Sequence, residues 1–330
     1  MINKMKKRFL HLMVVLCVAT LAACGSSASG EEEKVVIATN GDDEAVEAME
    51  TALKDAGYEG KYVLQSLGTS ELGGKLLVEG EKTDADLITM SSYYIESAQK
   101  KYDMFADLTF EPKALDSAPA YYTPILSNTG SIFVNTEILK QKGLEMPTSI
   151  KGLVKPEYKD LVSIPNIMDS STGWLLVQSI ISEYGEEEGK EILKQLIANV
   201  GPHLESSGSG PIKKVQAGEV AVGFGLRHQA VAAKENGEPI DFVDPKEGNF
   251  SLTESVAVVK KDEATTELAQ EMAKVIIEDG REELIESYPV ALYEGETVSE
   301  SNKPAHSKTF SEPLTVDLLK KHQDFFKSAK

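Results

Sequence analysis

The chain has 330 residues and a formal net charge of −19, from 53 acidic and 34 basic side chains. A surface this acidic repels phosphate backbones, so the composition argues against nucleic-acid binding. The length exceeds that of one typical hydrophobic core, so we expect two lobes.

The N-terminus joins a basic stretch, residues 1–8, to the mostly apolar run Phe9–Ala23. This run is long enough for a signal peptide and short for a membrane span. We therefore expect residues 1–23 to be a signal peptide and residues 24–33, which are rich in Gly and Ser, to be a flexible tether. Loss of the four basic residues of the signal would take the net charge from −19 to about −23.

The end of the apolar run, Leu21-Ala22-Ala23-Cys24, resembles the lipobox of bacterial lipoproteins. The resemblance implies cleavage before Cys24 and lipid attachment to it, which would anchor the protein to the extracytoplasmic face of the cell membrane. A plain secretory signal with a chance cysteine is the alternative. Because Cys17 lies within the signal, the mature chain would keep one cysteine and form no disulfide.

Three predicted strands, Lys34–Thr39, Lys61–Ser66 and Asp86–Met90, are each followed by a helical pattern. This alternation predicts an α/β fold with a mainly parallel sheet and helices on its faces. Small molecules bind such sheets beyond the carboxyl ends of the strands. The candidate ligand contacts there are Asn40, Ser70, Ser91 and Ser92, each of which could instead be a cap or turn residue.

The next predicted strand begins at Thr129, a further candidate contact, and leaves the first lobe. A return strand, Glu254–Lys260, would bring the chain back. We therefore predict one lobe from residues 34–128 with about 252–290, and a second lobe from 129–251. Residues 291–330 are expected to form a tail whose terminal helix, Thr315–Lys327, packs on a lobe.

The stretch Glu205–Pro211 combines hydroxyl residues with glycines and leads into a helical segment. Backbone N–H groups at such a turn, together with the positive end of the helix dipole, suit an anion. A second turn of hydroxyl residues opens the helix after Asp169. Both turns could be ordinary loops with a serine N-cap. The candidate anion contacts are Ser170, Ser171, Thr172, Ser206, Ser207, Gly208 and Ser209.

Several stretches together with the lipobox resemble the bacterial extracellular solute-binding proteins of ABC importers. They are Gly68–Leu72, Ile132–Leu139, Lys155–Asp160 and Gly218–Gly223. The resemblance covers nearly the whole chain after the signal and is nearest to the branch of ferric-iron, 2-aminoethylphosphonate and hexose-phosphate binders. It implies two α/β lobes of the type II periplasmic-binding-protein fold, joined by crossing strands, which close on a ligand in the cleft. The expected partners are a small ligand, the permease and its ATPase, for a monomeric chain without cofactor or metal.

Ferric members of that branch resemble one another in two adjacent tyrosines after the strand that here is Val220–Gly225. This chain has Leu226-Arg227-His228-Gln229 instead. A guanidinium at Arg227 opposes a bare cation and suits a phosphate or phosphonate, and His228 could donate to the same group. The predicted ligand is therefore a small phosphonate or phosphate ester, such as 2-aminoethylphosphonate. A surface salt bridge for Arg227 and a strand-end cap for His228 are the alternatives.

Ferric iron remains the alternative ligand, because the tyrosine pairs Tyr93-Tyr94 and Tyr121-Tyr122 could supply phenolates. A hydrolase on a similar scaffold is not expected, since the chain has no Gly-x-Ser-x-Gly elbow and no His-Glu-x-x-His motif. The sequence does not separate transport from sensing. If the ligand carries an amine, the unranked acidic partners are Asp42, Glu71, Glu205 and Glu254.

Overall fold

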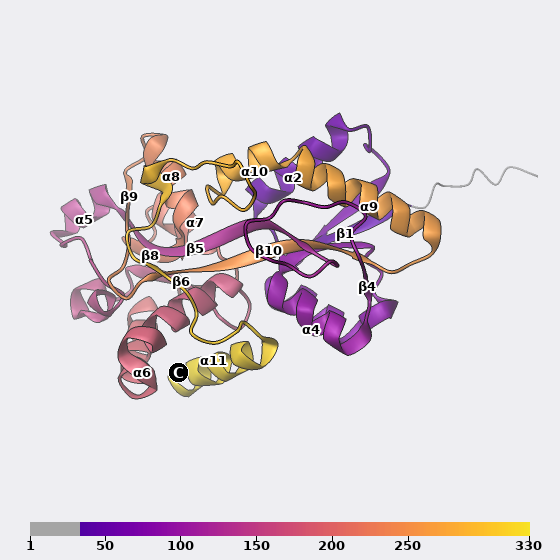
Figure 1. The fold of residues 1–330 in the computed structure, drawn as a ribbon. Helices are drawn as coiled ribbons and strands as arrows, with labels where there is room; N and C mark the ends of the chain where they lie inside the picture. The colour runs from indigo at the N-terminus through magenta and orange to yellow at the C-terminus, as the bar shows by residue number, and fades with distance from the viewer. Residues whose placement is uncertain (1–33) are drawn as a thin grey trace, which may run out of the picture. The chain divides into compact units, whose positions relative to one another are not determined.

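The computed structural model describes residues 34–330, from which the fold follows (Figure 1). The predicted signal peptide, the lipidation site at Cys24 and the tether up to residue 33 lie outside the described residues. Within 34–330, no helix combines the length and the apolar character that crossing a membrane requires.

The first half of the sheet contains three parallel strands, β1 (Val35–Thr39), β2 (Tyr62–Ser66) and β3 (Leu87–Ser91). Strands β1 and β3 are apolar and buried, as expected for strands covered on both faces. The following helices are α2 (Asp43–Asp55), α3 (Thr69–Glu79) and α4 (Ser92–Tyr102). The predicted α/β class is confirmed, and the strands have the predicted positions.

Two long strands, β5 (Thr123–Asn135) and β10 (Asn249–Val259), run antiparallel through the middle of the sheet (Figure 1). The first part of β5 pairs with β10, and from Gly130 onward β5 pairs with strands of the second half instead. The register of β10 shifts at a bulge between Glu254 and Ser255. The two halves of the sheet are thus joined by continuous strands. The lobe boundaries given above remain a prediction.

The second half of the sheet contains β6 (Val162–Pro165), β7 (Leu204–Glu205), β8 (Val222–Leu226) and β9 (Ile240–Val243). The strand order is β2-β1-β3-β10-β5-β8-β6-β7, with β9 paired to β5. The helices of this half are α5 (Thr136–Lys142), α6 (Ser171–Val200), α7 (Gly210–Gln216) and α8 (Arg227–Glu235). Helix α6 is kinked at Gly185, where φ is 71° and a side chain would be strained.

The remaining elements surround the two halves. Helix α9 (Glu263–Glu278) covers the first half and is followed by α10 (Arg281–Ser287). The short strands β4 (Phe105–Ala106) and β11 (Ser307–Lys308) pair with β10. Within residues 34–330, four 3-10 turns occupy residues 80–82, 151–154, 156–158 and 300–302. The chain ends in α11 (Val316–Ser328).

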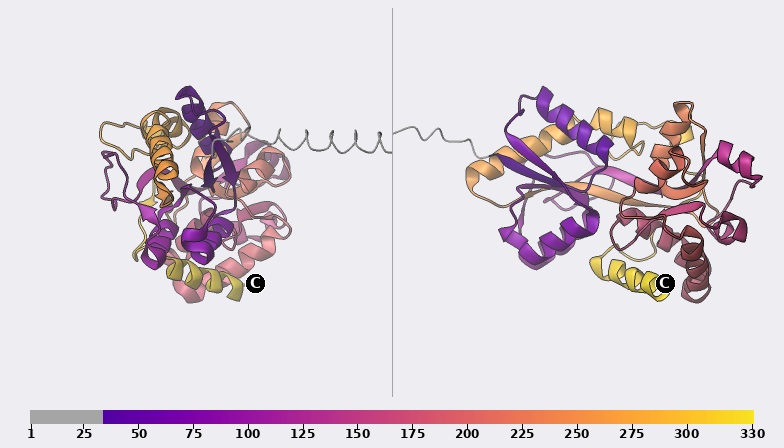
Figure 2. Two further views of the ribbon diagram at one scale, coloured as in Figure 1. Left: turned by 90° about the vertical axis from the view of Figure 1, so that its right-hand side faces the viewer. Right: turned by 180° about the vertical axis from the view of Figure 1, so that it is seen from behind.

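Helix α11 packs beside α6, as Figures 1 and 2 both show. Trp174 of α6 is fully buried, and its indole Nε1 donates a 2.7 Å hydrogen bond to Nδ1 of His322 on α11. His322 is itself only 4% exposed, and burial is the main cause that lowers its pKa to about 4. An imidazole nitrogen that accepts from an indole has to be unprotonated, which agrees with this direction.

Acid should therefore weaken the attachment of α11. The folded-state pKa of His322 lies below its ordinary value of about 6.5, so its stabilising contribution is complete above that value and is lost as pH falls. We expect the free energy of unfolding to fall by about 2 kcal/mol between pH 7.5 and pH 5, relative to His322→Gln. Urea unfolding of both proteins at the two pH values measures this difference. Equal pH dependence in both would contradict it.

Candidate ligand-binding site

A cleft of about 540 Å³ lies where the two halves of the sheet meet. Its lining comes from the starts of α2, α3, α6 and α7 and from the middle of β5 and β10. This volume is in the range of pockets that hold small ligands. The lining residues are Asn40, Gly41, Asp42, Asp43, Ser66, Leu67, Gly68, Thr69, Ser70, Glu71, Asn128, Asp169, Ser170, Ser171, Thr172, Ser206, Ser207, Gly208, Ser209, Lys213 and Glu254.

Three helices of eleven or more residues begin at this cleft. The residues before their first turns, Asp42 for α2, Gly68 for α3 and Ser170 for α6, all line it. The first N–H groups of a helix have no partner within the helix, and the helix dipole places positive charge there. At each of these helix starts, the first-turn N–H groups that have no acceptor within the protein could therefore donate hydrogen bonds to an anion.

The two hydroxyl-rich turns predicted from the sequence lie against each other. The Ser170 hydroxyl caps α6 by accepting a 3.2 Å hydrogen bond from the backbone N–H of Thr172. Gly208 of the other turn packs so tightly on Thr172 that an added Cβ would lie 3.1 Å from the Thr172 Cβ. The structure thus brings residues 170–172 and 206–209 together in the lining of one cleft.

The cleft floor is formed by Glu254, which is only 3% exposed. Its Oε1 accepts hydrogen bonds from Nδ2 of Asn40, at 3.0 Å, and from Nδ2 of Asn128, at 3.3 Å. The pKa of Glu254 is raised to about 8, first by burial and then by the charge of Asp42, against the lowering effect of the two amides. The pKa of Asp42 is raised to about 7, chiefly by burial and next by the charge of Glu44.

Charge in the cleft is mixed, and acidic side chains outnumber basic ones in the lining. Five of the lining residues carry carboxyl groups, and one, Lys213, carries an amine. Lys213 lies 3.1 Å from Asp43 in an exposed ion pair. Four of these carboxyl groups lie at or beside the helix starts, and Glu254 lies on β10, so a ligand with negative charge alone would meet carboxyl groups close to the helix N–H donors. The carboxyl-bearing residues are Asp42, Asp43, Glu71, Asp169 and Glu254.

Residues of the two halves touch across the cleft. The backbone N–H of Ser70, in the first turn of α3, donates to the Asp169 carbonyl at 3.3 Å. Nε2 of Gln229 on α8 donates to Oε1 of Glu44 on α2 at 3.1 Å. These contacts, with the Lys213 and Asp43 pair, bring the walls within hydrogen-bonding reach of each other.

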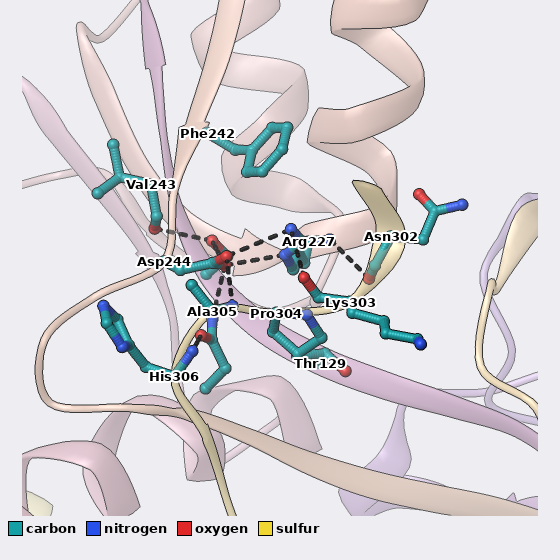
Figure 3. Close-up of polar contacts among 12 residues, drawn as sticks. Thr129, Arg227, Phe242, Val243, Asp244, Asn302, Lys303, Pro304, Ala305 and His306 are labelled. Atoms are coloured by element: carbon teal, nitrogen blue, oxygen red, sulfur yellow. Dashed lines mark hydrogen bonds and ion pairs between the residues drawn. The ribbon is translucent and has the colours of Figure 1, made fainter. Parts of the chain in front are cut away.

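Arg227 lies outside this lining, contrary to its predicted role as a ligand contact. Its guanidinium bonds both carboxylate oxygens of Asp244, at 2.8 and 3.3 Å, and donates to the Asn302 carbonyl at 2.8 Å (Figure 3). It also stacks 4.6 Å from the centre of the Phe242 ring. These partners engage all three guanidinium nitrogens, and the side chain is 5% exposed. Through these hydrogen bonds Arg227 links the tail, at residues 301–303, to Asp244 of the second half, so we do not include it in the ligand site.

His228 is not part of the cleft lining either. Its ring packs 4.3 Å from the ring of Tyr288, and burial lowers its pKa to about 3, so it is a neutral imidazole. A neutral, buried ring outside the lining does not supply the charged donor that the sequence prediction assigned to it. His228 is accordingly left out of the ligand site as well.

Three predicted hydroxyl contacts are absent from the cleft lining: Ser91 at the end of β3, Ser92 at the start of α4 and Thr129 in β5. Ser92 shares a 2.8 Å hydrogen bond with Ser255, and Thr129 shares one of the same length with Ser251. Ser91 is fully buried at the end of β3. Each side chain is held by the crossing strands or enclosed by the core, which removes it from ligand contact. Of the predicted contacts, Asn40, Ser70 and the two hydroxyl-rich turns do line the cleft.

Other lining residues were missed or left unranked. Thr69, Asn128, Asp169 and Lys213 were not singled out. The sequence feature that could have indicated Asn128 as a ligand contact is the polar run Ser127-Asn128-Thr129, which lies between two apolar stretches of the strand, residues 124–126 and 132–134. Of the four acids considered for a ligand amine, Glu205 is absent from the lining and lies 3.8 Å from Lys214, whereas the other three line the cleft.

Neither tyrosine pair considered for iron is part of the lining, although Tyr94 has a side-chain hydrogen bond with Ser70, which lines the cleft. Tyr93 packs edge-on against Trp174, with ring centres 5.1 Å apart, and Tyr122 donates a 2.7 Å hydrogen bond to Glu96. Within residues 34–330, no group of three or more His, Cys, Asp or Glu side chains has the arrangement of a metal site.

Comparisons with known proteins agree with this architecture. A curated Haemophilus influenzae protein of unknown function is 32% identical over 128 residues, which is 38% of this chain and 37% of the relative. The spermidine/putrescine-binding periplasmic protein of Salmonella typhimurium is 27% identical over 192 residues, which is 52% of this chain and 53% of the relative. The chain thus spans about half the length or less of these curated relatives.

Solved structures match over most of the chain. Periplasmic binding protein AfuA of Actinobacillus pleuropneumoniae, with fructose-6-phosphate bound, has a TM-score of 0.66 at 21% identity and covers 90% of this chain and 94% of its own. Iron-bound HitA of Pseudomonas aeruginosa has a TM-score of 0.68 at 17% identity and covers 90% and 99%. At these identities the likeness shows the fold, the two-lobed type II periplasmic-binding-protein architecture predicted above.

The model of the family described as bacterial extracellular solute-binding protein matches residues 84–309. This match covers more than half of the chain and includes β3, both crossing strands and the turns at 170–172 and 206–209. The chain therefore belongs to the bacterial extracellular solute-binding proteins.

Proposed function

We propose that the protein is the solute-binding component of an ABC importer and that its cleft captures a small phosphonate or phosphate ester, such as 2-aminoethylphosphonate. The observation that carries this proposal is the convergence of the starts of α2, α3 and α6 with the two hydroxyl-rich turns on one cleft. Charge-assisted hydrogen bonds from N–H and O–H groups are the usual means by which proteins hold phosphoryl oxygens.

On this proposal the protein binds and delivers its ligand without changing it. Its partners would be a permease and an ATPase, and the lipid at Cys24 would keep it at the extracytoplasmic face of the membrane. Closure of the two lobes on the ligand would present a form that the permease recognises. The family match and the fructose-6-phosphate in the similarly folded AfuA support this assignment.

A small diamine is a second candidate ligand. It is favoured by the five carboxyl groups of the lining and by the similarity to a spermidine/putrescine-binding protein. Ferric iron, the alternative considered from the sequence, has less support, because neither tyrosine pair belongs to the cleft lining.

Calorimetric titration distinguishes these ligands. The purified protein without its signal would be titrated with 2-aminoethylphosphonate, fructose 6-phosphate, putrescine and ferric citrate. We expect saturable heat with at least one of the two phosphorus compounds. Heat with ferric citrate alone, or with putrescine alone, would refute the phosphonate and phosphate-ester assignment.

The double replacement Ser207→Ala with Ser209→Ala tests the turn itself. Each charge-assisted hydrogen bond contributes about 1.5–3 kcal/mol, so loss of these hydroxyls should weaken binding of the anionic ligand at least severalfold. The control is Ser299→Ala with Ser301→Ala, which removes two exposed hydroxyls of the tail that bond each other outside the cleft. Unchanged affinity in the first double variant would show that the turn is an ordinary loop.

A further inference from the structure

We propose that the floor of the same cleft is a subsite for a ligand ammonium group, formed by Glu254, Asn128 and Asn40 with Asp42 beside them. The ligand would then be a zwitterion, with its anionic group at the helix starts and its ammonium group at the floor. This inference rests on the proposed function, because it adds a second charge to the ligand of that site.

The first observation is a pair of unused acceptors. Asn40 and Asn128 each donate their Nδ2 amide to Glu254, which fixes the orientation of both side chains. Their carbonyl oxygens, Oδ1, are buried and have no hydrogen-bond partner within residues 34–330. Asn128 is 6% exposed and lines the cleft. A buried carbonyl oxygen without a donor is costly, so this floor is suited to a ligand that donates.

The second observation is a buried acid without a basic partner. No Lys, Arg or His of the described chain forms an ion pair with Glu254. The one lysine of the lining, Lys213, is paired with Asp43 instead. Burial disfavours the ionised form of such a group, as the raised pKa of Glu254 reflects. A cation from the ligand would stabilise the ionised form of Glu254, for which the protein supplies no basic partner.

The chemistry of the acceptors matches an ammonium group. A primary ammonium has three donors and no acceptor. When Glu254 is ionised, it and the two Oδ1 atoms offer acceptors only; both N–H groups of the Asn40 amide are engaged by Thr69 and Glu254, and the Asn128 amide donates to Glu254. A second phosphoryl oxygen, which can only accept, would meet repulsion from the same atoms, and a hydroxyl could donate to one of them only.

The ammonium subsite and the anion-binding wall are adjacent. Nδ2 of Asn40 also donates to Oγ1 of Thr69, at 2.9 Å, and Thr69 is the first residue of α3. Asn40 therefore borders both the acidic floor and a helix start. A ligand needs only a short carbon linker between its two charged groups to reach both.

The test compares two phosphonates that differ in the amine. Wild-type protein should bind 2-aminoethylphosphonate at least tenfold more tightly than ethylphosphonate. In Glu254→Gln, which keeps the shape and the acceptor of the side chain, this preference should fall to less than threefold, mainly through weaker binding of the aminophosphonate. Calorimetry gives all four affinities, and thermal unfolding of the variant without ligand shows whether it is folded.

Glu47→Gln is the matched control, because it removes the same charge from an exposed position on α2 outside the cleft. It should keep the wild-type preference. If Glu254→Gln does not fold, Asn128→Ala replaces it, with the same expected loss of preference.

Each remaining outcome is decisive. Equal affinity of the wild type for the two phosphonates would overturn the ammonium subsite and leave the anion proposal standing. Binding of putrescine, but of neither phosphonate, with loss of that binding in Glu254→Gln, would refute the proposed anionic ligand and support the ammonium subsite. An unchanged preference in a folded Glu254→Gln variant would also overturn the inference.

Discussion

Replacing Gly208 with Ala is expected to lower affinity for the phosphonate or phosphate-ester ligand by at least tenfold. The added Cβ would overlap Oγ1 of Thr172 and approach its Cβ to 3.1 Å. Thr172 is β-branched and buried in the first turn of α6, so its side chain has little freedom to move aside. The turn at 206–209 would have to move instead, and a displacement of its donors costs hydrogen bonds to the ligand.

Calorimetry on the folded variant measures this loss. Gly74→Ala is the control, because Gly74 lies in α3 and an added Cβ there meets no atom within 4 Å. It should keep wild-type affinity. The double variant Gly208→Ala with Thr172→Ala relieves the overlap with Oγ1, so its loss should be smaller than the sum of the two single losses. Wild-type affinity in Gly208→Ala would contradict the tight contact between the turns.

Replacing Arg227 with Met is expected to lower the free energy of unfolding by about 3–5 kcal/mol while changing ligand affinity less than twofold. The change leaves the carboxylate of Asp244 partly buried without its cation, and losing one partner of a buried pair has this magnitude. Burial acts to raise the pKa of Asp244, but the hydrogen bonds from Arg227 and from the Ala305 N–H hold it below its ordinary value. The tail carbonyls at 301–303 also lose their donor.

Urea unfolding and calorimetry on the same preparation separate the two effects. Lys234→Met is the matched control, because Lys234 also lies over the Phe242 ring and pairs with an acid, Asp241, but is half exposed. Its free energy of unfolding should change by less than about 1 kcal/mol. A large loss of affinity with little loss of stability in Arg227→Met would return Arg227 to the ligand site.

The parts of the site that could be predicted from sequence depend on local chemistry. Ser170 caps a helix through a bond two residues away, and the turn at 206–209 precedes α7 directly. Capping and turn preferences depend on residues that are close in sequence, so they can be recognised without knowing the tertiary structure. Alternation of apolar strands and helical patterns likewise predicted the α/β sheet.

What could not be predicted depends on distant partners. The direction of Arg227 is set by Asp244, 17 residues away, and by the tail, about 75 residues away. The meeting of Asn128 with Glu254 spans 126 residues and follows from the pairing of β5 with β10. The sequence names both Glu254 and Glu205 as possible partners of a ligand amine. Only the register of β10 against β5 shows that Glu254 lines the cleft, whereas Glu205 does not.

The bulge in β10 lies at Glu254, on the cleft floor. It shifts the register against β5 between Glu254 and Ser255, whereas the pairing with β3 continues through both residues. A bulge bends a strand and increases its local twist. Glu254 therefore lies at a bend in a strand that runs through the middle of the sheet, so a shift of its backbone on ligand binding would change the path of that strand directly, without an intervening loop.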